Sequence, residues 1–207
     1  MNPVSFWNER YQNKAYYFGT APNHFIQHTL DQIGPVENQT LIELGCGEGR
    51  NSVYAAGMGY AVTATDVADI GLQKTRALAD SNQVELTTRI FDILQGSIQA
   101  EYDMVILSFV HMPPEHKNDL YQCISSLCKP GGCVIAEWYH PRQRLDGYSS
   151  GGPQDPAMMV TLSELEEVFN QQPWHARHIE YRLDHLHEGQ GHVGLAALSR
   201  LYACKES

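Results

Sequence analysis

The sequence predicts an α/β fold, with a mostly parallel sheet and helices on both of its faces. Strand-like apolar runs alternate with helix-compatible segments along most of the chain, and this order favours parallel strands joined by right-handed crossovers. Near the C-terminus, two long strand-like segments flank Glu188-Gly189-Gln190-Gly191, a hairpin turn. The closing hairpin must therefore add an antiparallel strand to the sheet.

The first half of the chain alternates regularly after an aromatic-rich start. A helix is expected at residues 24–33, after the breakers Gly19 and Pro22, and the first strand at 40–44. A short helix follows a glycine loop and ends near Gly57 and Gly59. A strand at 61–65, a helix at 72–78 and a strand at 86–91 complete this half.

The second half begins with a strand at 102–109, whose β-branched run is typical of burial on both faces. A helix at 115–127 ends at a Lys-Pro-Gly-Gly turn, and a strand follows at 133–138. Residues 140–160 are rich in Gly and Pro and predict a long loop or lid. A capping box at Thr161–Glu164 begins the last helix, and the hairpin strands lie at 175–186 and 192–203.

Composition indicates one globular domain. The 207 residues are 43% hydrophobic and 18% charged, with a net charge of -10 that argues against nucleic acid and against anionic membranes. No apolar signal core or spanning segment is seen, so a cytoplasmic location is expected. We divide the single domain 1–207 into a cap segment (1–34), a core (35–139), the loop or lid (140–160) and a C-terminal helix and hairpin (161–207).

The five cysteines predict reduced thiols. Their number is odd and no short paired spacing occurs, which is unlike a disulfide framework. Cys123, Cys128 and Cys133 recur every five residues, a spacing that matches no common zinc pattern. We expect small buried apolar residues and no metal site.

A glycine-rich loop after the first strand is the strongest functional signal. It reads Glu43-Leu44-Gly45-Cys46-Gly47-Glu48-Gly49-Arg50-Asn51. Glycine at every second position is typical of a backbone cleared for a ligand between a strand and a helix. A nicotinamide or flavin fingerprint would place the third glycine one position later. The spacing therefore disfavours a pyrophosphate ligand.

Three acids near this loop suggest an aminoacyl nucleoside. Glu43 precedes the first glycine by two positions and suits an ammonium group, directly or through water. Asp66 ends the second strand, where a carboxylate can accept both ribose hydroxyls. Asp92 ends the third strand and could reach the exocyclic amine of adenine. Asp66 or Asp92 alone is as well explained as a solvated loop acid, but the two together, each at a strand end, indicate a nucleoside.

With these residues, the chain resembles the class I S-adenosylmethionine-dependent methyltransferases, and is most similar to the small bacterial tellurite-resistance type. The resemblance also includes Leu127–Gly132, Trp7–Tyr11 and Phe18–Asn23. It implies a Rossmann-like seven-stranded sheet with an antiparallel last strand, and S-adenosylmethionine as cofactor. Arg50 contacts the cofactor carboxylate or simply begins the helix. The expected cofactor-binding residues are Glu43, Gly45, Cys46, Gly47, Gly49, Arg50, Asp66, Val67, Asp92, Ile93, Ser108, Trp7 and Tyr17.

In methyl transfer the cofactor supplies the electrophile, so the protein mainly has to align the acceptor and exclude water. If the acceptor needs a base, His111 or His140 are candidates, and the alternative for His111 is a surface or helix-capping residue. Arg142 either binds an anionic substrate group or is a solvated cation. Aromatic residues of the cap could close over the sulfonium or simply pack a helix. His185, His187 and His192 could bind a metal, but we place their hairpin away from the cofactor side and expect solvated side chains.

The leading functional prediction is methyl transfer to a small-molecule acceptor, such as a thiol or a metalloid oxyanion like tellurite or selenite. The alternative is a non-catalytic module that binds or senses S-adenosylmethionine or a related nucleoside. A nicotinamide oxidoreductase is disfavoured by the glycine spacing. The sequence identifies neither the acceptor nor the oligomeric state.

Overall fold

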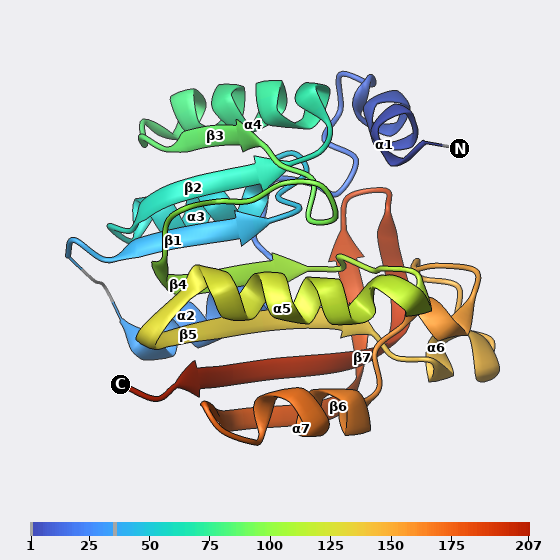
Figure 1. Cartoon of the computed structure of the whole chain (residues 1–207). Helices are drawn as coiled ribbons and strands as arrows, with labels where there is room; N and C mark the ends of the chain where they lie inside the picture. Colours follow the sequence, from blue (N-terminus) through green and yellow to red (C-terminus); the bar gives the residue numbers. More distant parts are fainter. Residues whose placement is uncertain (1, 35–36) are drawn as a thin grey trace.

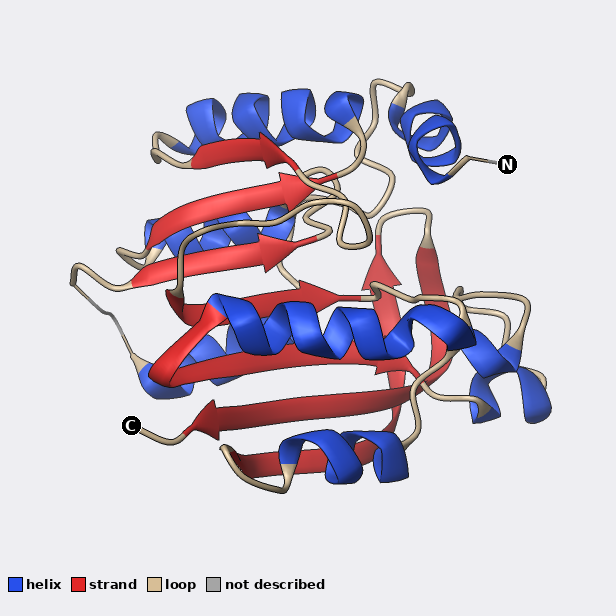
Figure 2. Ribbon diagram, in the orientation of Figure 1, coloured by secondary structure: helices blue, strands red, loops and turns tan. Residues whose placement is uncertain are grey.

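The computed structural model describes residues 2–34 and 37–207 as a seven-stranded sheet with helices on both faces (Figures 1 and 2). The strand order is β3-β2-β1-β4-β5-β7-β6. The strands are β1 Thr40–Leu44, β2 Ala61–Asp66, β3 Thr87–Ile90, β4 Tyr102–Ser108, β5 Cys128–Tyr139, β6 Trp174–Glu188 and β7 His192–Lys205. Only β7 runs against the others, because β5 and β6 both pair with it in antiparallel fashion. The predicted fold class is confirmed.

Helices cover the two faces in separate groups. They are α1 Pro3–Tyr11, α2 His24–Ile33, α3 Arg50–Gly57, α4 Asp69–Asn82, α5 Lys117–Leu127, α6 Arg142–Leu145 and α7 Leu162–Phe169. Successive strand residues point to opposite faces, so Leu41 packs with α2 and α3 whereas Ile42 packs with α5 and α7. The central strands β1 and β4 are buried along most of their length, which explains their continuous apolar runs.

Two predicted segments differ in detail from the structure. Residues 140–160 are not featureless, since they contain α6 and a 3-10 turn at Pro156–Met158. The turn signal at 129–132 lies inside β5, where the pairing jumps from Tyr102 with Cys128 to Met104 with Cys133. Glycine and proline there interrupt the ladder without ending the strand.

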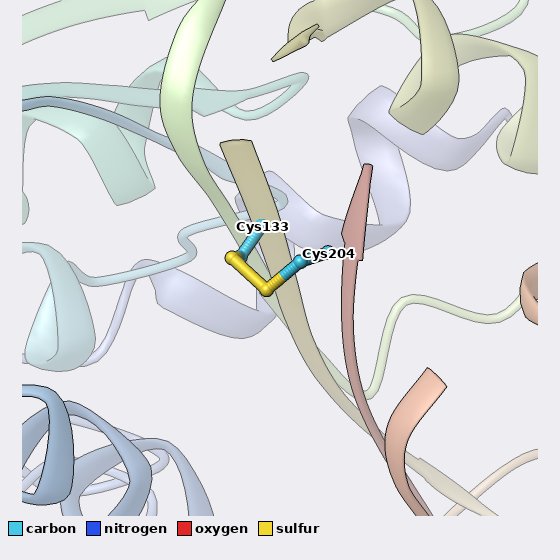
Figure 3. The surroundings of a disulfide bond; sticks show 2 residues. All are labelled: Cys133 and Cys204. Carbon is cyan, nitrogen blue, oxygen red and sulfur yellow. A yellow bond between two sulfur atoms is a disulfide. The ribbon is translucent and has the colours of Figure 1, made fainter. Parts of the chain in front are cut away.

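The prediction of five reduced cysteines is wrong. Cys133 and Cys204 form a disulfide, shown in Figure 3 between neighbouring strands. They are directly paired residues of β5 and β7, with their Cα atoms 4.0 Å apart. The two positions are 71 residues apart in the sequence, so only the sheet register reveals them as neighbours. Cys46, Cys123 and Cys128 are free thiols.

None of the helices in the described parts of the chain has the length and apolar character needed to span a membrane.

Candidate functional site

The candidate site lies at the carboxyl edge of the sheet, where the glycine loop joins β1 to α3. Gly45, Gly47 and Gly49 all have positive φ, at 63°, 56° and 90°. A Cβ on Gly45 would lie 2.6 Å from Val110 Cγ2, and one on Gly49 would lie 2.5 Å from Thr75 Cγ2. Glycine is therefore required both by backbone conformation and by close protein neighbours. The side chain of Cys46 is buried with Leu72 of α4, which leaves only its backbone on the loop.

Asp66 braces the glycine loop from the end of β2. Its Oδ2 accepts a hydrogen bond from Gly47 N at 2.8 Å, and its Oδ1 accepts one from Ala68 N at 2.8 Å. Burial raises the pKa of Asp66, and the backbone N–H donors oppose that rise. Val67 is half-buried beside it.

Asp92 lies just beyond the end of β3, at the same edge as Asp66. The two ends adjoin because β2 and β3 are parallel, with Asp66 paired to Ile90. Asp92 Oδ1 accepts a hydrogen bond from Leu94 N at 2.9 Å, and Ile93 packs against the apolar core under α5. Parallel pairing thus brings the two predicted nucleoside acids to neighbouring positions.

Glu43 is buried against the first turn of α3 rather than facing open space. It accepts hydrogen bonds from Asn51 Nδ2 at 2.8 Å and from the Ser52 hydroxyl. Asn51 also donates to Ser108 Oγ at 3.1 Å, which ties the end of β4 to the same group. Burial raises the pKa of Glu43 to about 7, although these donors and Arg50 oppose the rise.

Arg50 begins α3 and also projects its guanidinium into a buried position at the site. Its Nη2 donates to Glu188 Oε2 at 2.8 Å. Its Nη1 is buried and has no hydrogen-bond partner within residues 2–34 and 37–207. A buried donor without a hydrogen bond lowers stability unless a ligand or a water molecule accepts a hydrogen bond from it.

The aromatic cap segment packs against the glycine loop and the start of α4. Figure 1 shows its helix α1 beside α4. Glu48 Oε2 accepts hydrogen bonds from Tyr17 N at 2.7 Å and from Phe18 N at 3.3 Å. Trp7 stacks on Tyr11 with ring centroids 5.6 Å apart. A Cβ on Gly47 would lie 2.9 Å from the Tyr11 hydroxyl, so the cap and the loop are in direct contact.

The tip of the β6–β7 hairpin lies at this site, and our placement of it away from the cofactor side is wrong. Gln190 N and Gly191 N both donate to Tyr17 O, at 2.7 and 3.0 Å. The antiparallel β7 starts at the edge where the parallel strands end, so β6 must deliver Glu188 there. His185 and His187 are exposed, but His192 is buried and bonded to Glu188.

The candidate bases His111 and His140 are both engaged by backbone groups. Nδ1 of His111 lies 3.2 Å from Met158 O, and its Nε2 accepts from Tyr139 N at 3.3 Å. Burial lowers the pKa of His111 to about 3. Nδ1 of His140 accepts from Arg142 N at 3.1 Å. With both ring nitrogens occupied, His111 fastens the strand-end loops and is poorly suited to take a proton.

Arg142 lies on the exposed side of residues 140–160, paired with Asp146 at 2.8 Å. The organising cation of this segment is instead Arg144, which donates to the carbonyl oxygens of Tyr148, Gly151, Gly152 and Pro153. The segment is thereby folded onto itself and packed against the hairpin, where Val193 N donates to Ser150 O at 3.1 Å. A lid role for residues 140–160 stays a prediction.

A buried ionic network below the hairpin was not predicted from the sequence. Arg200 Nε donates to Glu137 Oε2 at 2.5 Å, and Asn23 Nδ2 donates to Glu137 Oε1 at 2.6 Å. Asn23 Nδ2 also donates to Glu188 Oε1 at 2.9 Å. Glu137 and Arg200 each interrupt an otherwise apolar strand, and this was the available signal.

Comparisons with known proteins identify the family. A family model described as "Tellurite resistance protein TehB" matches residues 6–136. A probable S-adenosyl-L-methionine-dependent methyltransferase TehB of Haemophilus influenzae is 29% identical over 104 residues, or 49% of this chain. That alignment covers only 36% of the relative's own length.

Solved structures share the fold over nearly the whole chain. The crystal structure of TehB from Haemophilus influenzae superimposes with a TM-score of 0.70 at 18% identity, over 99% of this chain and 67% of that one. The N-methyltransferase NodS from Bradyrhizobium japonicum, solved with S-adenosyl-l-homocysteine, gives 0.72 at 13% identity over 100% of both chains. With the family match spanning more than half of the sequence, the chain belongs to the TehB family.

Proposed function

We propose that this protein transfers the methyl group of S-adenosylmethionine to a small-molecule acceptor. The observation that carries the proposal is the buried Nη1 of Arg50, which has no partner among the described residues, beside a loop with three glycines and two carboxylates at adjacent strand ends. A free guanidinium donor suits the cofactor's carboxylate. NodS, which shares the fold, was solved with the demethylated form of this cofactor.

Each predicted residue would have a defined task. Arg50 would hold the carboxylate of the methionine part, and the backbone of the glycine loop would run beside that part. Asp66 would accept the ribose hydroxyls, because a carboxylate oxygen that takes one backbone N–H retains a second lone pair. Asp92 would face the adenine amine. When bound, S-adenosylmethionine supplies an electrophilic methyl group, so the protein mainly aligns the acceptor and excludes water.

The acceptor is proposed as a soft nucleophile, a thiol or a metalloid oxyanion such as tellurite or selenite. The family's description as tellurite resistance proteins supports this choice. A non-catalytic module that only binds the cofactor is the competing proposal. Release of S-adenosylhomocysteine from a panel of thiols, selenite, tellurite, amines and phenols distinguishes the two.

Calorimetry of S-adenosylmethionine binding tests the cofactor site. Asp66→Ala should weaken binding roughly 10- to 100-fold, because charge-assisted hydrogen bonds to the ribose are lost. Asp69→Ala is the matched control, since Asp69 is an exposed acid three residues further along the chain. Urea unfolding of both variants separates lost binding from lost stability. Equal affinity of the wild type and Asp66→Ala would refute the ribose assignment.

A further inference from the structure

The hairpin tip holds a buried carboxylate–imidazole pair. His192 Nδ1 lies 2.9 Å from Glu188 Oε2, and the two side chains are only 8% and 10% exposed. Glu188 also accepts from Arg50 and Asn23, so its carboxylate is fixed from three directions. A carboxylate can only accept hydrogen bonds, which places the proton of neutral His192 on Nδ1 and the lone pair on Nε2.

Aromatic rings surround the imidazole of His192. The ring centroids of Phe109 and Phe18 lie 4.2 and 4.5 Å from that of His192, and the centroid of Tyr139 lies at 5.4 Å. Within residues 2–34 and 37–207, Nε2 of His192 has no hydrogen-bond partner. It is thus the ring nitrogen that remains open, in contrast to the two occupied nitrogens of His111.

Phe109 is held in an unfavourable backbone conformation to make this contact. Its φ is 58°, in the left-handed region that bulky side chains rarely adopt. Phe109 directly follows Ser108 at the end of β4, and its N–H donates to Glu137 O at 2.8 Å. Strain of this kind is commonly found at functional sites. It places an aromatic ring between the site edge of β4 and His192.

We infer that His192, oriented by Glu188, is the general base that removes the proton from a neutral protic methyl acceptor held among aromatic rings. This inference rests on the proposed function and narrows its acceptor class, thiols or metalloid oxyanions, to uncharged thiols. Apolar rings favour such acceptors over a metalloid dianion, whose desolvation would be costly.

The proton and electron balance is complete without another reactant. The acceptor's lone pair forms the bond to the methyl carbon, the sulfonium carbon–sulfur bond breaks, and its electron pair stays on sulfur. His192 Nε2 takes the acceptor's proton, becomes imidazolium, and later releases that proton to solvent. Glu188 stabilises the imidazolium through the Nδ1 hydrogen bond.

The charges around His192 are consistent with a neutral base. Burial lowers the pKa of His192, as do Arg50 and Arg10, whereas Glu188 raises it. His111, in the loop after β4, interacts with His192 electrostatically, and the ring of Tyr139 on β5 lies beside that of His192. The base is therefore in its proton-accepting form at neutral pH. Activity on a protic acceptor should fall as the solution is acidified through this pKa.

A pair of thiols tests the assignment. His192→Gln should lower kcat roughly 10²- to 10⁴-fold for 2-mercaptoethanol, which is protonated at neutral pH, because a general base contributes that much. Pentafluorothiophenol is already ionised at neutral pH and needs no base, so the His192→Gln variant should methylate it nearly as fast as the wild type does. His175→Gln, at the exposed opposite end of β6, is the matched control and should change neither rate. Equal losses for both thiols, or none for 2-mercaptoethanol, would overturn the inference.

A second readout does not depend on turnover. Nitrogen-15 NMR of the imidazoles, assigned with His192→Gln, should show neutral His192 with its proton on Nδ1 at pH 7. Detection of the Nε2–H tautomer or of imidazolium would overturn the inference even if neither thiol is methylated. Wild-type protein that fails to bind S-adenosylmethionine in calorimetry would instead refute the proposed function, so the two failures are distinguishable.

Discussion

Two regions of the carboxyl edge are held together by contacts of very different range. Within the glycine-loop region (residues 43–52, Asp66 and Asp92), the hydrogen bonds of Asn51 with Glu43 and of Gly47 with Asp66 join residues 8 and 19 positions apart. In the hairpin region (residues 17–23, 137–160 and 188–200), the hydrogen bonds of Arg200 with Glu137 and of Asn23 with Glu188 join residues 63 and 165 positions apart. Contacts between residues close in the sequence produce a motif that can be recognised there, whereas partners far apart in the sequence are seen only as isolated polar residues.

The largest expected effect is a loss of stability when the hairpin region loses the cation of its buried ionic network. Arg200→Met removes the cation from Glu137, which has no exposed surface, and should lower the free energy of unfolding by about 3–5 kcal/mol. Burial already raises the pKa of Glu137, and loss of Arg200 removes the main opposing influence. Urea denaturation at pH 7 measures this loss.

Two controls accompany that measurement. Arg182→Met, at an exposed position of β6, should change the free energy by less than about 0.5 kcal/mol. The double variant Glu137→Leu/Arg200→Met should recover most of the loss, because no buried charge remains unpaired. A loss below about 1 kcal/mol for Arg200→Met alone would show that the network is not important for stability.

The two regions should also respond to pH with opposite sign. The pKa of Glu43 is raised from 4.5 to about 7, so the folded state binds the proton more tightly, and stability present below pH 4.5 is lost as pH rises through 7. The pKa of Glu188 is lowered from 4.5 to about 2, mainly by His192 and Arg50 acting against burial, so its contribution is present above pH 4.5 and lost as pH falls through 2.

Glutamine substitutions isolate these two contributions. At pH 8, Glu43→Gln should stabilise the protein by up to about 3 kcal/mol, whereas Glu188→Gln should destabilise it by up to a similar amount. Both differences should shrink toward zero at the pH where the replaced group is protonated in both states. Unfolding free energies across pH 2–8 measure the disappearance of the Glu43 difference below pH 4.5 and the decline of the Glu188 difference toward pH 2. Effects of the same sign at pH 8 would contradict the comparison.

The smallest expected effect is a loss of stability from a single methyl group added to the glycine loop. Gly49→Ala should cost about 2 kcal/mol of stability, because φ is 90° and the new Cβ would meet Thr75. Gly57→Ala is the control, since nothing lies within 4 Å of its Cβ position in α3, and it should stabilise the protein by up to about 1 kcal/mol. Thermal unfolding compares the two, and similar melting temperatures would exclude a tight loop.

The accuracy of the sequence-based predictions follows the same division. Strand alternation predicted the sheet and its antiparallel last strand, and the strand ends located Asp66 and Asp92, because both depend on local periodicity. The disulfide between Cys133 and Cys204 and the position of the hairpin tip were predicted wrongly. Both depend on which strands become neighbours, and the order β5-β7-β6 is not local information.

By itself, the sequence determined the fold class and the loop that is cleared of side chains, since glycine spacing and apolar periodicity act over a few residues. Only the tertiary structure decided that Nη1 of Arg50 is buried without a partner among the described residues, that both ring nitrogens of His111 are hydrogen-bonded, and that His192 is paired with Glu188. These contacts, from the Glu188–His192 pair to the hydrogen bond that joins Arg50 to Glu188 across 138 positions, are set by strand order and register. Those are properties of the folded sheet, not of any segment.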